Sequence, residues 1–170
     1  MFREFVDGFL GSKIDPRNAR TTRITRNVLN QPLANKKMSH HLVFVYGSLR
    51  RGNVGAMSVR FPDATFIAEG TVHGRLYDLG AYPGLVLDGA ASVVTGEVYE
   101  VDDDTLHRLD KFELTSDYSR KHVEVEHGSE LTDCWIYVPE RDAEFFSNRE
   151  LIESGDWIEH VRSRHSRRTD

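Results

Sequence analysis

The hydrophobic residues of this chain fall into short runs that have the length and composition of β-strands. The clearest run is Leu42–Tyr46, in which aliphatic, β-branched and aromatic residues follow one another without a polar interruption. Such a run predicts a strand that is buried on both faces. It stops at Gly47 and Ser48, so a short polar loop is expected directly after this strand.

Further strands and a few short helices are predicted along the rest of the chain. Apolar patterns bounded by Gly, Pro, Asn and Asp predict strands over residues 65–69, 71–79, 85–87, 91–101, 118–127 and 131–138. Helices are expected over residues 53–60, from the Asp102–Asp104 run to Glu113, and over residues 143–153. The second helix repeats Leu106, Leu109 and Phe112 at spacings that place them on one apolar face.

Two of these elements carry expectations about single positions. In the helix over residues 53–60, Asn53 is the expected cap, and Val54 and Met57 are expected to pack inward. Gly74 lies inside the strand predicted over residues 71–79. A glycine there indicates a bulge or a close approach of another segment of backbone.

Many strands joined by short helices indicate an α+β fold, in which a small mixed β-barrel or curled sheet carries helices on its outside. A chain of 170 residues is long enough for one ordinary domain. We place this domain at residues 40–158. Residues 1–39 are expected to form a disordered basic extension, and residues 159–170 a flexible basic tail. Met38 is an alternative natural start, because it leads directly into the first strand.

Charge and composition narrow the function classes. The net charge is −5, yet residues 1–37 hold eight basic and three acidic residues, so the body is more acidic than the whole chain. An acidic body argues against nucleic acid as a partner, because phosphate contacts require clustered Lys and Arg. No apolar run is long enough to span a membrane. The single cysteine, Cys134, excludes an internal disulfide and predicts a cytoplasmic location. No oligomeric state follows from the sequence.

Two features point to possible chemistry. The loop at Gly47 and Ser48 can turn several backbone N–H groups toward one point and hold a carboxylate or phosphate, although a simple tight turn is the alternative. Glu113 follows an apolar helix face, where loss of solvation would raise the pKa of its carboxyl group and suit a general base near neutral pH. The alternative for Glu113 is a solvated position at the helix end.

Other candidate residues have less support. Ser48 is not in a Gly-x-Ser-x-Gly elbow, and its loop lacks the Gly-Lys-Ser/Thr ending of a phosphate-binding loop. Cys134 lies in a predicted strand and is expected to be a core residue. The eight histidines are scattered and show no zinc-binding spacing. These residues therefore predict no metal site.

Four motifs, taken together, resemble the γ-glutamylcyclotransferase-like family, also called AIG2-like, and match its small bacterial-type members best. They are Phe44-Val45-Tyr46-Gly47-Ser48-Leu49-Arg50-Arg51-Gly52; Gly74-Arg75-Leu76-Tyr77-Asp78 with Tyr82-Pro83; Gly96-Glu97-Val98-Tyr99 with Leu109-Asp110-Lys111-Phe112-Glu113 and Tyr118; and Cys134-Trp135-Ile136-Tyr137-Val138 with Ser154-Gly155-Asp156-Trp157. Each motif alone is weak. Their order and spacing make the resemblance strong.

The resemblance implies a barrel of six strands or a similar number and a small γ-glutamyl compound as substrate. In such enzymes the free α-amino group attacks its own γ-carbonyl, which closes 5-oxoproline and expels an amine, and no metal or organic cofactor is needed. Glu113 is the implied catalytic acid/base. The implied substrate-binding residues are Tyr46, Gly47, Ser48, Leu49, Tyr118 and Tyr137.

The resemblance leaves two questions open. The first is the leaving group, because glutathione, γ-glutamyl amino acids, γ-glutamyl-ε-lysine and antibiotic precursors are all handled within the wider superfamily. The second is activity itself, because a fold can keep its cavity and lose its chemistry. The alternative function is therefore a non-catalytic metabolite-binding module of the same fold, with its basic arms contacting an anionic partner. The spacing of Arg17, Arg20, Arg23 and Arg26 motivates it.

Overall fold

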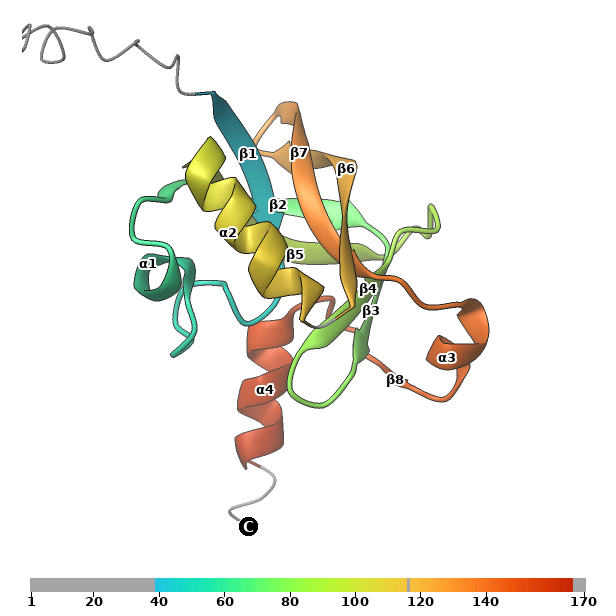
Figure 1. Ribbon diagram of the computed structural model, residues 1–170. Coiled ribbons are helices and arrows are strands. Elements are labelled where there is room, and N and C mark those ends of the chain that lie inside the picture. Colours follow the sequence, from blue (N-terminus) through green and yellow to red (C-terminus); the bar gives the residue numbers. More distant parts are fainter. Residues whose placement is uncertain (1–38, 116, 167–170) are drawn as a thin grey trace, which may run out of the picture. The chain divides into compact units, whose positions relative to one another are not determined.

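In the computed structural model, which describes residues 39–115 and 117–166, five strands close into a barrel (Figure 1). All neighbouring strands of the barrel are antiparallel except β1 and β7, whose parallel pairing closes it. The resemblance implied six strands or a similar number, and the closed barrel has five. Their order is β1 (His40–Val45), β5 (Val93–Asp102), β2 (Thr65–His73), β6 (Tyr118–His127) and β7 (Glu130–Pro139).

Strand β1 is buried on both faces, as its unbroken apolar run predicts. Successive side chains of a strand point to opposite faces. Accordingly, Phe44 and Tyr46 pack into one hydrophobic cluster, and Val43 and Val45 pack into the other. The first cluster also holds Cys134, which is 1% exposed and is a core residue as expected. Strand β1 thus joins the two hydrophobic cores.

The barrel interior leaves no room for a side chain at Gly96 of β5. A methyl group built on Gly96 would overlap the ring of Phe44 and the carbonyl oxygen of Val45. Glycine therefore allows β1 and β5 to pair closely at the point where β1 leads into its loop. This is a packing requirement, because Gly96 has no unusual backbone conformation.

A smaller sheet of three strands, in the order β4-β3-β8, lies beside the barrel. Its strands are β3 (Arg75–Asp78), β4 (Pro83–Val86) and β8 (Glu150–Leu151). The single strand predicted over residues 71–79 is wrong, because the chain leaves the barrel after His73 and enters this second sheet. The close approach expected at Gly74 is confirmed, since a methyl group there would lie 2.7 Å from the carbonyl oxygen of Val86.

Helix α2 (Asp103–Leu114) lies against the barrel and matches its predicted range (Figure 1). Asp102 caps it, and its side chain accepts a hydrogen bond from the N–H of Thr105 at 2.7 Å. Leu106 and Leu109 are buried and pack against β1 and β5 residues of the second cluster. The helix ends one residue after Glu113, which places that residue in its last turn.

The predicted helices at residues 53–60 and 143–153 are shorter in the structure. Helix α1 is Met57–Arg60, and Val54 is 97% exposed, so the inward packing expected of Val54 is wrong. Helix α3 is Ala143–Ser147, after which the chain extends and pairs as β8 with β3. In both segments, only some of the apolar residues pack against another part of the protein.

The C-terminal prediction requires a larger correction. Residues 159–166 were expected to belong to a flexible tail beyond a domain that ends at 158, but helix α4 spans Trp157–Ser166. Trp157 is buried, and His160 and Arg164 both contact Asp78. These contacts between residues distant in sequence hold the segment in place, although its charge alone predicts a flexible tail.

Residues 1–38 and 167–170 lie outside the described residues. Among the described helices, none is long and apolar enough to cross a membrane.

Candidate active site

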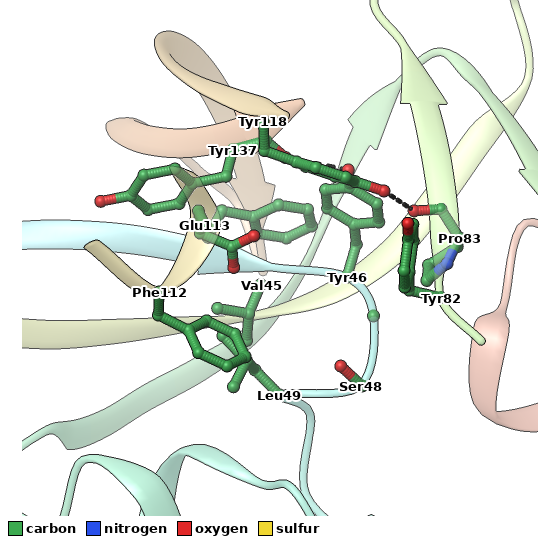
Figure 2. A pocket seen from close by; sticks show the side chains of 12 residues that line it. Val45, Tyr46, Ser48, Leu49, Tyr82, Pro83, Phe112, Glu113, Tyr118 and Tyr137 are labelled. Atoms are coloured by element: carbon green, nitrogen blue, oxygen red, sulfur yellow. Dashed lines mark hydrogen bonds between the residues drawn. The ribbon is translucent and has the colours of Figure 1, made fainter. Parts of the chain in front are cut away.

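A pocket opens where the loop after β1, the end of α2 and the loop before β4 meet (Figure 2). Its empty space is about 560 Å³, and part of this volume is open to solvent. All seven residues that the sequence singled out line it: Tyr46, Gly47, Ser48, Leu49, Glu113, Tyr118 and Tyr137. The other lining residues are Phe44, Val45, Tyr82, Pro83 and Phe112.

The loop after β1 turns sharply at the pocket wall. The carbonyl of Gly47 accepts a hydrogen bond from the N–H of Arg50 at 3.1 Å. Among the described residues, we find no hydrogen-bond acceptor for the N–H groups of Gly47, Ser48 and Leu49. Gly47 also packs closely, because a methyl group built on it would lie 3.0 Å from Cδ of Pro83. The loop can therefore offer backbone donors to a bound anion.

A buried carboxylate holds this loop from behind. Glu97, which is 3% exposed, accepts the N–H of Arg51 at 3.0 Å (Oε2) and 3.2 Å (Oε1), and its Oε2 accepts the hydroxyl of Tyr99 at 2.9 Å. Arg50, also buried, donates to Asp156 at 3.0 Å. These contacts tie the end of the loop to the barrel wall and to the start of α4.

Glu113 is partly buried in the last turn of α2, and its carboxylate faces the pocket between aromatic rings (Figure 2). Burial raises the pKa of this carboxyl group from its ordinary value of 4.5 to about 7. None of the described residues that line the pocket is Lys, Arg or His, so no cation on the wall counteracts the effect. A carboxyl group in this state can both accept and donate a proton at neutral pH.

The tyrosine rings of the pocket are held by their hydroxyl groups. The hydroxyl of Tyr46 donates to the carbonyl of Tyr137 at 2.9 Å, and that of Tyr118 donates to the carbonyl of Pro83 at 2.6 Å. The hydroxyl of Tyr137 donates to Asp110 at 2.7 Å. Burial raises the pKa of all three phenols, so they stay protonated. Their rings serve as a fixed apolar wall.

Sequence reasoning did not single out Tyr82, Pro83 and Phe112 as site residues. The loop after β3 brings Tyr82 to Tyr118, with the ring centroids 5.9 Å apart in an edge-to-face arrangement. Phe112 was expected only as part of the apolar face of its helix. The position of Tyr82 and Pro83 at the pocket depends on strand pairing that the sequence pattern does not reveal.

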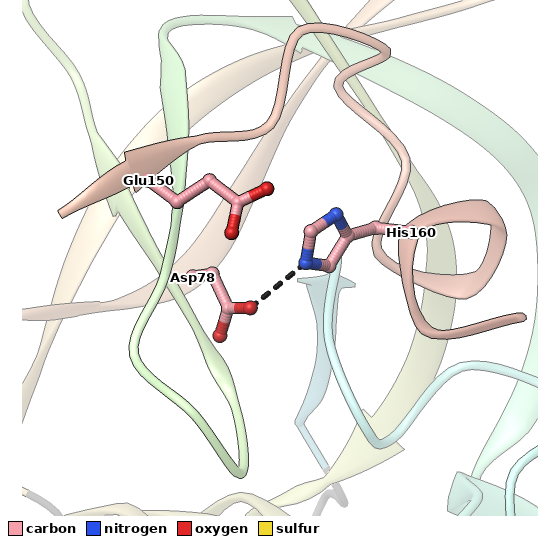
Figure 3. Close-up of side chains that lie close together, drawn as sticks. All are labelled: Asp78, Glu150 and His160. Atoms are coloured by element: carbon pink, nitrogen blue, oxygen red, sulfur yellow. Dashed lines mark hydrogen bonds and ion pairs between the residues drawn. The ribbon is translucent and has the colours of Figure 1, made fainter. Parts of the chain in front are cut away.

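A second cluster lies where α4 meets the small sheet (Figure 3). One ligand atom each of Asp78, Glu150 and His160 lie within 4.8 Å of one another. The carboxylate of Asp78 already binds His160 at 2.8 Å, Arg164 at 2.6 Å and the N–H of Gly80 at 2.6 Å. An arginine on the central carboxylate disfavours a metal cation there. We interpret the cluster as an anchor that joins α4 to the loop carrying Tyr82.

Fold and site together define a class of protein. A small barrel holds an aromatic pocket that is lined both by a carboxyl group with a pKa near 7 and by a loop whose N–H groups at residues 47–49 have no acceptor among the described residues. This combination is typical of an enzyme that binds a small carboxylate-bearing molecule and moves a proton on it.

Comparison with known proteins identifies the family. The profile of the family described as "Gamma-glutamyl cyclotransferase, AIG2-like" matches residues 43–159. A Vibrio cholerae protein named "Putative gamma-glutamylcyclotransferase" is 42% identical over 122 residues, which are 71% of this chain and 98% of that protein. The chain therefore belongs to the γ-glutamylcyclotransferase, AIG2-like family, and is a γ-glutamylcyclotransferase-like enzyme.

Solved structures agree with this assignment. A mouse AIG2-like protein is similar with a TM-score of 0.59 at 30% identity, over 70% of this chain and 88% of the mouse chain. YkqA from Bacillus subtilis is similar with a TM-score of 0.61 at 30% identity, over 75% of this chain but only 43% of the longer YkqA chain. The barrel with its flanking helices is thus the fold of this family.

Proposed function

We propose that this enzyme converts a γ-glutamyl amine or peptide to 5-oxoproline and a free amine. The observation that carries the proposal is the pKa of about 7 of Glu113, in a pocket that is also lined by the loop after β1, whose N–H groups at residues 47–49 have no acceptor in the described part of the chain. Membership of the family supports the same reaction class.

The loop after β1 would bind the substrate. Its N–H groups at Gly47, Ser48 and Leu49 match the α-carboxylate of a γ-glutamyl group, which carries a full negative charge. The aliphatic part of the γ-glutamyl chain would lie along the tyrosine rings. Binding in this way bends the chain so that its α-nitrogen approaches its own γ-carbonyl, and ring closure then needs no second molecule.

Glu113 would move the proton. Its carboxylate takes a proton from the α-ammonium group, and the freed nitrogen attacks the γ-carbon to form the C–N bond of the lactam. The protonated Glu113 then donates to the nitrogen of the leaving amine, and the original amide C–N bond breaks. The ring nitrogen gives up its second proton to the released amine, so that the products are 5-oxoproline and an ammonium ion. A pKa near 7 suits both halves of this cycle, because the two forms of the carboxyl group are then similar in population.

The test is release of 5-oxoproline, measured by mass spectrometry, from a panel of γ-glutamyl dipeptides, γ-glutamyl amines, γ-glutamyl-ε-lysine and glutathione. We expect Glu113→Gln, which is nearly isosteric, to lower kcat by at least about 100-fold. The matched control is Glu153→Gln, which changes an exposed glutamate outside the pocket. Full turnover by Glu113→Gln would show that another group is the base.

The alternative of a non-catalytic binding module rests on the arginines at residues 17–26, which lie outside the described residues. The same panel decides it. If a γ-glutamyl compound raises the melting temperature of the protein but no compound releases 5-oxoproline, the binding module becomes the better description. Removal of residues 1–37 should leave turnover intact if the pocket performs the reaction, since the described lining residues all lie between Phe44 and Tyr137.

A further inference from the structure

A shallow basic groove borders the pocket on the side of α1. Its lining residues are Arg60, Phe61, Arg108, Lys111 and Phe112. Phe112 lines both this groove and the pocket, and it directly precedes Glu113 in the chain. A group that leaves the pocket over the ring of Phe112 therefore enters the groove.

Arg60 stands at the border between the groove and the pocket. Its guanidinium carbon lies 5.0 Å from the centroid of the Phe112 ring. On the other side, a methyl group built on Gly55 would lie 3.2 Å from Nε of Arg60 and 3.6 Å from the carbonyl oxygen of Ser48. Phe112 and Ser48 both line the pocket, so these contacts place the Arg60 side chain next to the pocket wall, although Arg60 itself lines only the groove.

Two of the three cations in the groove have no ion-pair partner among the described residues. Arg108 donates to the carbonyl of Arg60 at 3.1 Å and lies 3.5 Å from Asp63, so it braces α1 against α2. Within the described part of the chain, neither Arg60 nor Lys111 forms an ion pair. Positive charge without an ion-pair partner among the described residues thus lies beside a pocket whose described lining holds no cation, on a protein with a net charge of −5.

We propose that Arg60, with Lys111 in the same groove, binds a carboxylate carried by the leaving amine. This inference rests on the proposed function, because the scissile nitrogen must lie beside Glu113. In a γ-glutamyl amino acid or short peptide, the carbon of a carboxylate or peptide carbonyl is two bonds from that nitrogen, and it would reach the guanidinium by lying over the ring of Phe112, on which Arg60 stacks. Arginine suits this role, since its planar group matches a carboxylate. The preferred substrates are γ-glutamyl amino acids, and γ-glutamyl amines without a carboxylate are turned over less efficiently.

The kinetic test compares two substrates that differ only in that carboxylate: γ-glutamyl-alanine and γ-glutamyl-ethylamide. The quantity measured is the ratio of their kcat/KM values at low ionic strength. We expect the wild-type ratio to favour the alanine compound and Arg60→Gln to lower it about fivefold, as for an exposed ion pair. Arg149→Gln is the matched control, because Arg149 also stacks on a phenylalanine, 4.7 Å from the Phe145 ring, outside both pocket and groove. It should keep the wild-type ratio.

A binding test is independent of turnover. N-glutaryl-alanine and N-glutaryl-ethylamide keep the α-carboxylate position but lack the α-amino group, so they cannot cyclise. Titration calorimetry should show that wild-type protein binds the alanine compound more tightly and that Arg60→Gln removes the difference. High salt should also reduce it, because exposed charges are screened.

The outcomes separate the two proposals. A preference for N-glutaryl-alanine that depends on Arg60, without release of 5-oxoproline from any substrate, would support the subsite and refute the proposed reaction. Release of 5-oxoproline with a substrate ratio that Arg60→Gln does not change would overturn the subsite and leave the reaction standing. An equal loss for both members of each pair would mean that Arg60 binds the α-carboxylate of the γ-glutamyl group, which also overturns the inference. Equal binding, or no binding of either glutaryl compound, refutes the subsite.

Discussion

The buried carboxyl group of Glu113 should make the stability of the protein depend on pH. Its pKa is about 7 in the folded protein and close to 4.5 in the unfolded chain. Between these values the folded state keeps a proton that the unfolded state has lost, so the free energy of unfolding falls as pH rises. The stabilisation is fully present below pH 4.5 and is lost as pH rises through about 7. The interval corresponds to about 3 kcal/mol at ~1.4 kcal/mol per pH unit.

Replacement of Glu113 by Gln removes this dependence, because the amide does not titrate. We expect the stability of Glu113→Gln relative to wild type to increase by about 3 kcal/mol between pH 4.5 and pH 8. Any constant cost of the amide in the pocket cancels, since only the change with pH is compared. The variant is thus expected to lose catalysis and gain relative stability at the pH where the enzyme would work.

The measurement is urea unfolding of wild type, Glu113→Gln and Glu153→Gln at pH 4.5, 6, 7 and 8. Glu153 is exposed, so its variant should follow the wild-type curve apart from a small offset. Other groups titrate equally in all three proteins and drop out of the differences. Parallel curves for wild type and Glu113→Gln would refute the argument, because they would mean that the Glu113 carboxylate is as well solvated in the folded protein as in the unfolded chain.

Three further predictions concern the same site. In wild-type protein, kcat/KM for 5-oxoproline release should rise with pH through an apparent pKa of about 7, because the carboxylate form of Glu113 accepts the proton, and a flat profile would contradict this. Glu97→Gln should cost about 3 kcal/mol in urea unfolding and raise KM, since it removes a buried charge that holds the N–H of Arg51; unchanged values of both would show that the loop is held otherwise. Gly47→Ala should raise KM about tenfold with little change in melting temperature, because the new methyl group lies 3.0 Å from Cδ of Pro83, so that Pro83 or the loop must shift slightly at the pocket wall; an unchanged KM would refute the close fit.

The parts of the fold that the sequence predicts well are those whose pattern is local. The run Leu42–Tyr46 shows a doubly buried strand, and the capped, amphipathic stretch up to Leu114 shows a helix, because neighbouring residues alone determine burial and capping there. Both elements deliver candidate site residues to the pocket. The catalytic interpretation of Glu113 came from its apolar surroundings and from family resemblance, and its role remains a prediction.

The parts that the sequence predicts poorly depend on distant partners. From the local sequence alone, the segment that forms helix α4 was predicted to be a flexible basic tail. The segment is held in place because Asp78, more than 80 residues earlier in the chain, binds His160 and Arg164. The residues of strand β8 were predicted to be the end of a helix, because the local pattern of apolar residues does not indicate their pairing with β3. The position of Tyr82 at the pocket likewise depends on strand pairing, so the local pattern did not predict it. The periodicity of apolar residues along the chain does not indicate which loop lies next to which strand.

The closure of the barrel also has a consequence for folding kinetics. Strand β1 pairs with β7 across about 90 residues of chain (Figure 1). The loop that follows β1 forms part of the wall of the pocket. Contacts so far apart in sequence form late, because the intervening chain must first lose its conformational freedom. The pocket therefore cannot be assembled on a partly folded chain. During refolding, ligand binding should return together with the slowest phase, when β1 takes its place between β5 and β7.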